Sequence, residues 1–154
     1  MTAYYLDTSA LIKRYVDESG SVWLRAQIDA TLQPLIISSH LLLAEMISAF
    51  NRRVREGALS REDYTYLRHA FQSDCLNEYV IIPVNQSIMD LATQLLERYP
   101  LRTLDALHLA TALSAQQFLT PYGLTGVTFL SSDDRLLAAA VAEELAVENP
   151  NHHP

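Results

Sequence analysis

The feature that most constrains the fold is an alternation of short apolar runs with longer amphipathic segments. The short runs contain β-branched or aromatic residues and are typical of buried strands, at residues 3–6, 34–38, 80–84 and 127–130. Helix-like patterns lie between them, at residues 9–16, 21–32, 40–56, 60 onward, 85–99, 103–118 and 133–145. Such an alternation favours a parallel sheet covered on both faces. The predicted fold class is therefore α/β, a three-layer α/β/α sandwich with a short, mainly parallel sheet.

The remaining segments complete this outline. Residues 120–126 contain Pro121, Gly123 and Gly126 and are predicted to form a loop. Residues 146–148 are expected to add an edge strand. A chain of 154 residues with 49% hydrophobic content suits one compact domain, which we place at residues 1–149. Residues 150–154 are expected to be a disordered tail.

Several features point to a cytoplasmic protein with no membrane segment. Cys75 is the single cysteine, so neither an intrachain disulfide nor a cysteine-rich zinc site is possible. The N-terminus lacks the basic and apolar regions of a signal peptide. The most apolar stretch, residues 35–50, is interrupted by polar side chains and is shorter than the ~20 apolar residues that span a bilayer.

The formal net charge of −7 argues against a general nucleic-acid binder, which usually carries a basic surface. Several acids gathered at one site and offset by divalent cations would leave the rest of the surface only mildly acidic. The charge therefore weakens the case for a nucleic-acid substrate without removing it.

Two acidic positions follow predicted strands. Asp7 ends the first strand, and Asp133 lies between a strand and a helix, with Asp134 as an equally acidic neighbour. Each residue has a structural explanation as a helix N-cap. However, the carboxyl ends of parallel strands meet at one edge of the sheet, where ligands bind in open α/β folds. Both positions are therefore candidate site residues, with the choice between Asp133 and Asp134 left open.

Two further acids lie within predicted helices. Asp105 falls in the first turn of its helix, where the helix dipole alone would favour a negative charge. Glu45 follows Leu41, Leu42 and Leu43, and an unpaired carboxylate in apolar surroundings would cost several kcal/mol. A buried pair with an arginine or a bound cation would each satisfy it. His108 lies one turn after Asp105 and is more readily explained as a hydrogen-bonded structural residue than as a ligand.

The four acids together predict a metal site. If Asp7, Asp105, Asp133 and Glu45 converge, mutual repulsion raises their pKa values unless a cation lies between them. All-oxygen ligands favour Mg²⁺ or Mn²⁺ over zinc. Such a site can polarise a phosphodiester and activate a water molecule for in-line attack.

The same residues resemble the PIN-domain ribonucleases, in particular the VapC-type toxins of type II toxin–antitoxin systems. The likeness spans nearly the whole chain in the order of the family. Its motifs are Leu6-Asp7-Thr8-Ser9-Ala10-Leu11, Leu43-Ala44-Glu45, Leu104-Asp105-Ala106-Leu107-His108-Leu109-Ala110-Thr111-Ala112 and Phe129-Leu130-Ser131-Ser132-Asp133.

The resemblance implies an endoribonuclease that depends on Mg²⁺ or Mn²⁺, with the acids at Asp7, Glu45, Asp105 and Asp133 around the metal. It also implies supporting hydroxyl groups at Ser9 and Ser131. Members of this family commonly form homodimers and are inhibited by a cognate antitoxin protein that enters the active-site groove. The alternative is a catalytically inactive PIN-like module that binds RNA or protein, although all four acids are present.

Basic residues near these acids are candidates for contacts with RNA phosphates. They are Lys13 and Arg14 after the first strand, Arg52 at the end of the Glu45 helix, and Arg102 before Asp105. The helix dipole also favours arginine near a helix C-terminus, which is the structural alternative for Arg52. Phosphatase and receiver-like folds are disfavoured, because Ser9 occupies the place of a second early acid and Lys13 is the only lysine.

Overall fold

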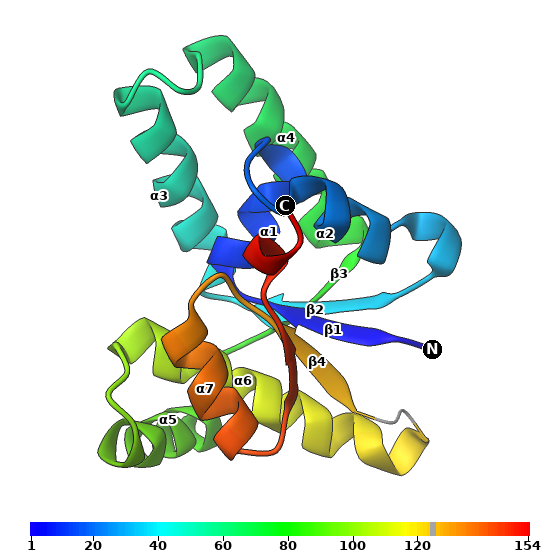
Figure 1. The fold of residues 1–154 in the computed structure, drawn as a ribbon, viewed down its shortest axis with the longest axis vertical. Coiled ribbons are helices and arrows are strands. Elements are labelled where there is room, and N and C mark those ends of the chain that lie inside the picture. The colour runs from blue at the N-terminus through cyan, green and yellow to red at the C-terminus, as the bar shows by residue number, and fades with distance from the viewer. Residues whose placement is uncertain (124–125) are drawn as a thin grey trace.

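The computed structural model describes residues 1–123 and 126–154, which form a parallel sheet with helices on both faces (Figure 1). The strands are β1 (Ala3–Leu6), β2 (Leu35–Ser39), β3 (Tyr79–Ile82), β4 (Val127–Leu130) and β5 (Ala146–Glu148). Their order across the five-stranded sheet is β3-β2-β1-β4-β5, and every neighbouring pair is parallel. The predicted α/β fold class is confirmed.

The helices divide into two layers. On one face lie α1 (Thr8–Tyr15), α2 (Ser21–Gln27), α3 (Leu42–Arg55) and α4 (Arg61–Asn77). On the other lie α5 (Gln86–Arg98), α6 (Thr103–Leu119) and α7 (Asp134–Ala142). In Figure 1, α3 and α4 form an arm that projects away from the sheet. None of the helices in the described residues is both long and apolar enough to cross a membrane.

Each strand buries side chains on both faces of the sheet. In β1, Tyr5 packs into the core beneath α5, α6 and α7, while its neighbour Leu6 packs into the core beneath α1 and α3. Phe129 and Leu130 of β4 divide between the two cores in the same way. Because both faces are covered, these strands are continuously apolar rather than alternating, which is why they stand out in the sequence.

The strand order places a topological switch point between β1 and β4. The chain moves outward from β1 through β2 to β3 and then returns to build β4 and β5 on the other side of β1. Where the connections from two neighbouring parallel strands run in opposite directions, their helices lie on opposite faces of the sheet. A crevice then opens at the carboxyl ends of these two strands. The segments that follow β1 and β4, which carry Asp7 and Asp133, therefore lie side by side.

Several element boundaries differ from the sequence expectation. The helix predicted at residues 21–32 is interrupted after Gln27 and resumes as a short 3-10 helix, η1 (Ala30–Leu32), because the Asp29 side chain caps a new turn. The helix predicted from residue 103 begins there as α6, with Arg102 at the N-cap position and without a side-chain capping bond. Residues 120–122 of the predicted loop form a 3-10 helix, η2 (Thr120–Tyr122), while residues 124–125 lie outside the described residues.

The C-terminal segment is ordered, so the prediction of a disordered tail was wrong. Residues 150–152 form a 3-10 helix, η3 (Pro150–His152), and the ring of His153 stacks on Trp23 with centroids 4.3 Å apart. Pro150 packs against Gly20, which has a φ of 85° and leaves no space for a Cβ. These contacts tie the segment to the start of α2, and local composition gives no sign of them.

Candidate active site

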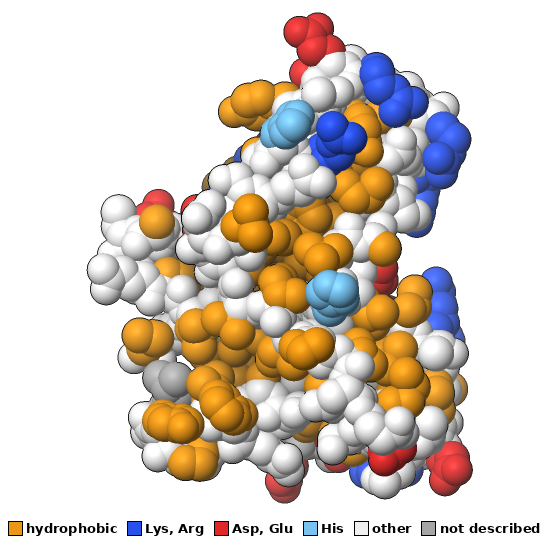
Figure 2. Space-filling model, turned by 180° about the vertical axis from the view of Figure 1, so that it is seen from behind, with side chains coloured by type: hydrophobic (Ala, Val, Ile, Leu, Met, Phe, Trp, Pro, Cys, Tyr) orange, Lys and Arg blue, Asp and Glu red, His pale blue; other side chains and the backbone are white. Residues whose placement is uncertain are grey.

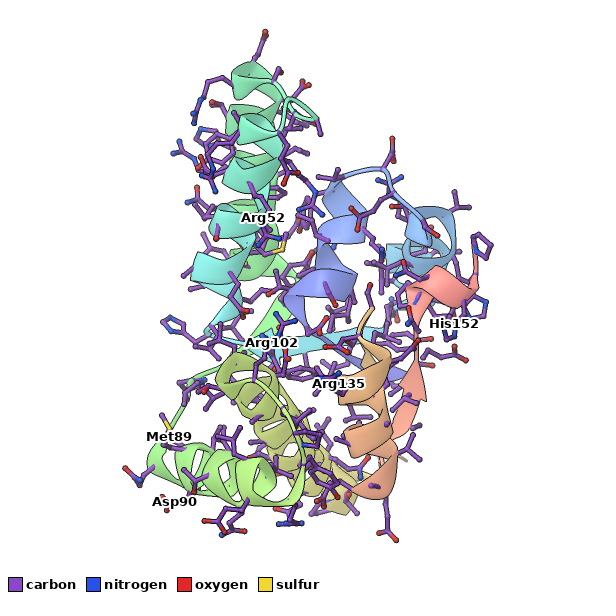
Figure 3. The ribbon with its side chains drawn as sticks, turned by 60° about the vertical axis from the view of Figure 1, so that its left-hand side comes forward. Arg52, Met89, Asp90, Arg102, Arg135 and His152 are labelled. Atoms are coloured by element: carbon purple, nitrogen blue, oxygen red, sulfur yellow. The ribbon has the colours of Figure 1, made fainter. Side chains whose placement is uncertain are left out.

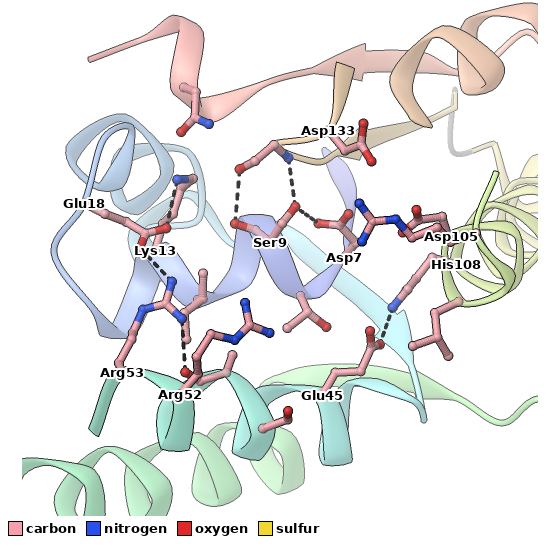
Figure 4. Close-up of a pocket in the computed structure, with 18 residues that line it drawn as sticks. Asp7, Ser9, Lys13, Glu18, Glu45, Arg52, Arg53, Asp105, His108 and Asp133 are labelled. Atoms are coloured by element: carbon pink, nitrogen blue, oxygen red, sulfur yellow. Dashed lines mark hydrogen bonds and ion pairs between the residues drawn. The ribbon is translucent and has the colours of Figure 1, made fainter. Parts of the chain in front are cut away.

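A pocket of about 500 Å³ opens at the carboxyl ends of β1 and β4. Asp7, Glu45, Asp105 and Asp133 all line it, together with Ser9 and His108. Figure 4 shows the three aspartates on one side and Glu45 approaching from α3 on the other. The structure therefore brings the four predicted acids to one cavity, although they come from four different elements.

Asp7 is the most deeply buried of these acids, at 5% exposure. Its Oδ1 accepts hydrogen bonds from the Ser9 hydroxyl at 2.7 Å and the Ala10 amide at 3.0 Å. Its Oδ2 accepts from the Ser131 hydroxyl at 2.6 Å. Asp7 thus caps α1, as the structural reading of the sequence predicted, and also faces the pocket. Burial raises the pKa of Asp7, although the nearby His108 and these hydrogen bonds act in the opposite direction.

The two predicted supporting hydroxyl groups join the ends of β1 and β4. The Ser9 hydroxyl accepts from the Ser132 amide at 2.9 Å, and the Ser131 hydroxyl accepts from the Asp133 amide at 3.0 Å. Each of these hydroxyls also donates to Asp7. Together they fix the Asp7 carboxylate relative to the turn that carries Asp133.

Asp133 and Asp134 have different surroundings. Asp133 lines the pocket and is the N-cap of α7, accepting from the Arg135 amide at 2.9 Å. Asp134 is not among the residues that line this pocket; its Oδ1 accepts from the Asn149 amide group at 2.8 Å. Of the two candidates, Asp133 is therefore the one that lies with Asp7 and Asp105.

Asp105 shows that the acids interact through their charges. Its pKa is raised first by burial and then by the negative charges of Asp133 and Asp7. Arg102 and His108 offset part of this effect. A third carboxylate placed against two others favours either a bound proton or a bound cation.

Glu45 is held by a histidine rather than by an arginine. His108 Nε2 lies 2.6 Å from Glu45 Oε1, and His108 Nδ1 lies 2.8 Å from the Tyr5 hydroxyl. The Glu45 side chain is 22% exposed, so it is less buried than its leucine-rich neighbourhood suggests. Glu45, Ser48 and Arg52 form a polar stripe of α3 that faces the pocket. The sequence placed His108 beside Asp105, but its partners Tyr5 and Glu45 are remote in the chain.

The basic residues divide into two groups. Arg52 and Arg102 are exposed at the pocket, and Figure 3 shows them on the arm and at the start of α6. Lys13 lines the pocket but is buried and paired with Glu18 at 3.0 Å. Arg14 does not line this pocket, because its guanidinium pairs with Glu78 at 2.8 Å on the far side of α1.

An ion pair between two pocket residues, Glu18 and Arg53, was not predicted from the sequence. The Glu18 carboxylate accepts from Lys13 and, at 2.9 Å, from Arg53. Burial acts to raise the pKa of Glu18, but these two cations outweigh it and lower the pKa. The Glu18–Arg53 ion pair links the segment before α2 to α3 of the arm. The two residues are remote in the sequence, so only the tertiary structure reveals that they pair.

The donor set fits a hydrated hard cation. Within residues 1–123 and 126–154, no three His, Cys, Asp or Glu side chains lie close enough to enclose one metal ion. Mg²⁺ does not need such a cage, because it keeps several of its waters and takes one or two carboxylates directly. Burial raises the pKa of both Asp7 and Asp105, and the charges of Asp133 and Asp7 raise that of Asp105 further, so a nearby cation would stabilise the charged form of both groups.

Comparison with known proteins agrees with this arrangement. The chain is 33% identical to ribonuclease VapC46 of Mycobacterium tuberculosis over 157 residues, covering 98% of this chain and 100% of the relative. Among solved structures, it resembles a chain of VapBC2 from Rickettsia felis bound to a promoter DNA fragment, with a TM-score of 0.65 and 15% identity. It also resembles a chain of a toxin–antitoxin complex from Klebsiella pneumoniae, with a TM-score of 0.59 and 18% identity. Each structural likeness covers 96% of this chain and 98% of the other.

At these low identities, the two structural likenesses support the fold. The sequence comparison carries the family assignment, because the PIN domain model matches residues 4–142, which hold all four acids and both supporting serines. The chain therefore belongs to the PIN-domain family.

Proposed function

We propose that the chain is a divalent-metal-dependent endoribonuclease that acts as the toxin of a toxin–antitoxin pair. The observation that carries this proposal is the convergence of Asp7, Glu45, Asp105 and Asp133 on one pocket. The likeness to a ribonuclease over 98% of the chain supports RNA as the substrate. The cytoplasm, where such RNA is found, is the proposed location.

A Mg²⁺ or Mn²⁺ ion would polarise the scissile phosphodiester and supply a nucleophilic water molecule. Asp7, Asp105 and Asp133 are the residues proposed to hold it, with Glu45 approaching from the opposite wall. Ser9 and Ser131 orient the buried Asp7 carboxylate through bonds of 2.7 and 2.6 Å. Their role is to keep this carboxylate in one position.

Binding of the RNA strand is assigned to the exposed guanidinium groups of Arg52 and Arg102. They flank the acids from the arm and from the start of α6 (Figure 3), so a phosphate chain crossing the pocket passes between them. Lys13 and Arg53 are engaged with Glu18 and contribute mainly to the shape of the wall. Arg14, proposed from the sequence as a further contact, is directed elsewhere and is left out of this assignment.

A second surface suits the proposed antitoxin partner. On the side of α3 away from the acids, an apolar groove of about 550 Å³ runs between α3, α4 and β3, lined by His40, Leu43, Ile47, Phe71, Gln72, Cys75, Leu76 and Ile81. Hydrophobic side chains gather on the face of the molecule shown in Figure 2. Exposed apolar surface of this kind marks protein interaction sites. The likeness to a toxin–antitoxin complex favours an antitoxin as the occupant. The homodimer implied by the family resemblance remains a prediction.

The decisive experiment compares purified wild-type protein with Asp105→Asn on total RNA. The protein is first treated with a chelator and then supplied with Mg²⁺ or Mn²⁺. Cleavage by the wild type that needs the added metal and is lost in the variant supports the proposal. A correctly folded wild type that cleaves no RNA with either metal would instead favour the alternative, an inactive module that binds RNA or protein.

A further inference from the structure

A buried hydrogen-bonded chain joins three of the elements that form the site. Tyr5 lies in β1 two residues before Asp7 and is fully buried, with 0% exposure. His108 lies in α6 one turn after Asp105 and is 2% exposed. Both ring nitrogens of His108 are engaged, Nδ1 with the Tyr5 hydroxyl at 2.8 Å and Nε2 with Glu45 Oε1 at 2.6 Å.

The direction of the bond to Glu45 follows from the chemistry of the groups. An ionised carboxylate only accepts hydrogen bonds, so His108 Nε2 must carry the hydrogen and donate it. The Tyr5 hydroxyl can either donate to or accept from Nδ1, so it engages this nitrogen whether or not Nδ1 carries a hydrogen. With Nδ1 engaged by Tyr5, the ring is oriented so that Nε2 donates to Glu45.

We infer that His108, oriented by Tyr5, is a positioning residue that holds the Glu45 carboxylate toward the aspartates across the pocket. Glu45 projects from α3 on the opposite side of the pocket from the three aspartates (Figure 4), and its bond to His108 ties its carboxylate to α6, the helix that also carries Asp105. The bond to His108 engages only one of the two carboxylate oxygens of Glu45, Oε1, and Glu45 lines the pocket. Hydrogen bonds to a metal-ligating carboxylate fix its orientation, and removing such a partner typically costs about 10–100-fold in metal affinity or activity.

This inference deepens the proposed function and rests on it. The test measures Mn²⁺ binding by the full chain, by isothermal titration calorimetry, alongside RNA cleavage. The variants are His108→Leu, which removes the donor, His108→Gln, whose amide can replace Nε2, and Tyr5→Phe, which removes the bond to Nδ1. Ile88→Val in α5 is the matched core control, because it disturbs the same core without touching Glu45.

We expect His108→Leu to weaken Mn²⁺ binding and cleavage by about 10–100-fold. We expect His108→Gln to restore most of both, and Tyr5→Phe to give a smaller loss. Ile88→Val should lower only the melting temperature. A His108→Leu protein that is folded and binds Mn²⁺ like the wild type would overturn the inference.

The same variants separate a positioning role from a catalytic one. If His108→Gln binds Mn²⁺ and cleaves RNA as poorly as His108→Leu, the imidazole itself is required and positioning is the wrong explanation. A wild type that neither binds Mn²⁺ nor cleaves RNA would refute the proposed function as well. A wild type that does both, with unchanged His108 variants, would refute this inference alone.

Discussion

Replacing Asp7 with asparagine should separate the contribution of its charge to activity from its contribution to folding. Asparagine keeps the shape of the side chain, and its Oδ1 still accepts from Ser9 and Ala10. Its Nδ2 donates to the Ser131 hydroxyl, which must then turn its own hydrogen elsewhere. The fold therefore keeps a capped α1, while the pocket loses its most buried negative charge.

The expected change in stability follows from the pKa of Asp7. Burial raises this pKa, so the charged carboxylate is less stable in the folded protein than in the unfolded chain. Against this, the variant weakens hydrogen bonds to a charged group, each worth about 1.5–3 kcal/mol, to neutral bonds worth about 0.5–1.5 kcal/mol. The raised pKa of Asp7 is the net result of burial and of these hydrogen bonds. We therefore expect Asp7→Asn to unfold at the same temperature as the wild type, or a few degrees higher, at neutral pH, since ~1 kcal/mol shifts the melting temperature by about 2–4 °C.

The dependence on pH has a definite sign. Asp7 has a higher pKa in the folded protein than in the unfolded chain, where it is about 3.9. Such an acid stabilises the fold below its pKa in the unfolded chain, and this stabilisation is lost as the pH rises through its pKa in the folded protein. The wild type should therefore lose stability relative to Asp7→Asn from about pH 4 upward. Thermal unfolding in chelator, measured across this range, checks the prediction. Added Mg²⁺ should raise the melting temperature of the wild type more than that of the variant.

Cleavage of RNA should fall by orders of magnitude in the same Asp7→Asn protein. A variant that cleaves at the wild-type rate would refute the placement of Asp7 in the active site. A variant destabilised by more than about 3 kcal/mol at neutral pH, the cost of breaking a buried pair, would refute the electrostatic reasoning instead.

Three further predictions concern the surroundings of the site. Arg52→Ala should raise KM for RNA with little change in kcat. It should also reduce the slope of log KM against log salt by the amount that corresponds to the loss of about one phosphate contact. An unchanged slope would contradict the assigned RNA path. Gly20→Ala should destabilise the fold by at least the ~1–3 kcal/mol of a strained backbone, because its Cβ would lie 2.3 Å from the Pro150 carbonyl oxygen. Urea unfolding measures this loss of stability. A variant as stable as the wild type would show that the C-terminal segment detaches readily. Leu76 lines the apolar groove and is 86% exposed. Leu76→Lys should abolish co-purification of a co-expressed antitoxin while leaving RNA cleavage by the free protein intact. Persistence of the complex would place the antitoxin elsewhere.

The sequence by itself determined the strands and the positions of the acids at their ends. Buried parallel strands are continuously apolar, and Asp7 and Asp133 follow such strands directly. Residues that end a strand at a switch point meet because the topology brings the strand ends together. The predicted helix starts at residues 60 and 85 are also local, because the Ser60 and Asn85 side chains each accept from an amide only three residues away.

Only the tertiary structure decided which side chains satisfy one another. Glu45 and His108 are 63 residues apart, and Tyr5 and His108 are 103 residues apart, so no local pattern predicts their hydrogen bonds. The same reason explains Arg14, which the sequence assigned to RNA but which pairs with Glu78. It also explains the C-terminal segment, whose order depends on contacts with Gly20 and Trp23 rather than on its own composition. Burial and pairing are properties of the assembled fold, because a polar side chain takes whichever partner the packing places within reach.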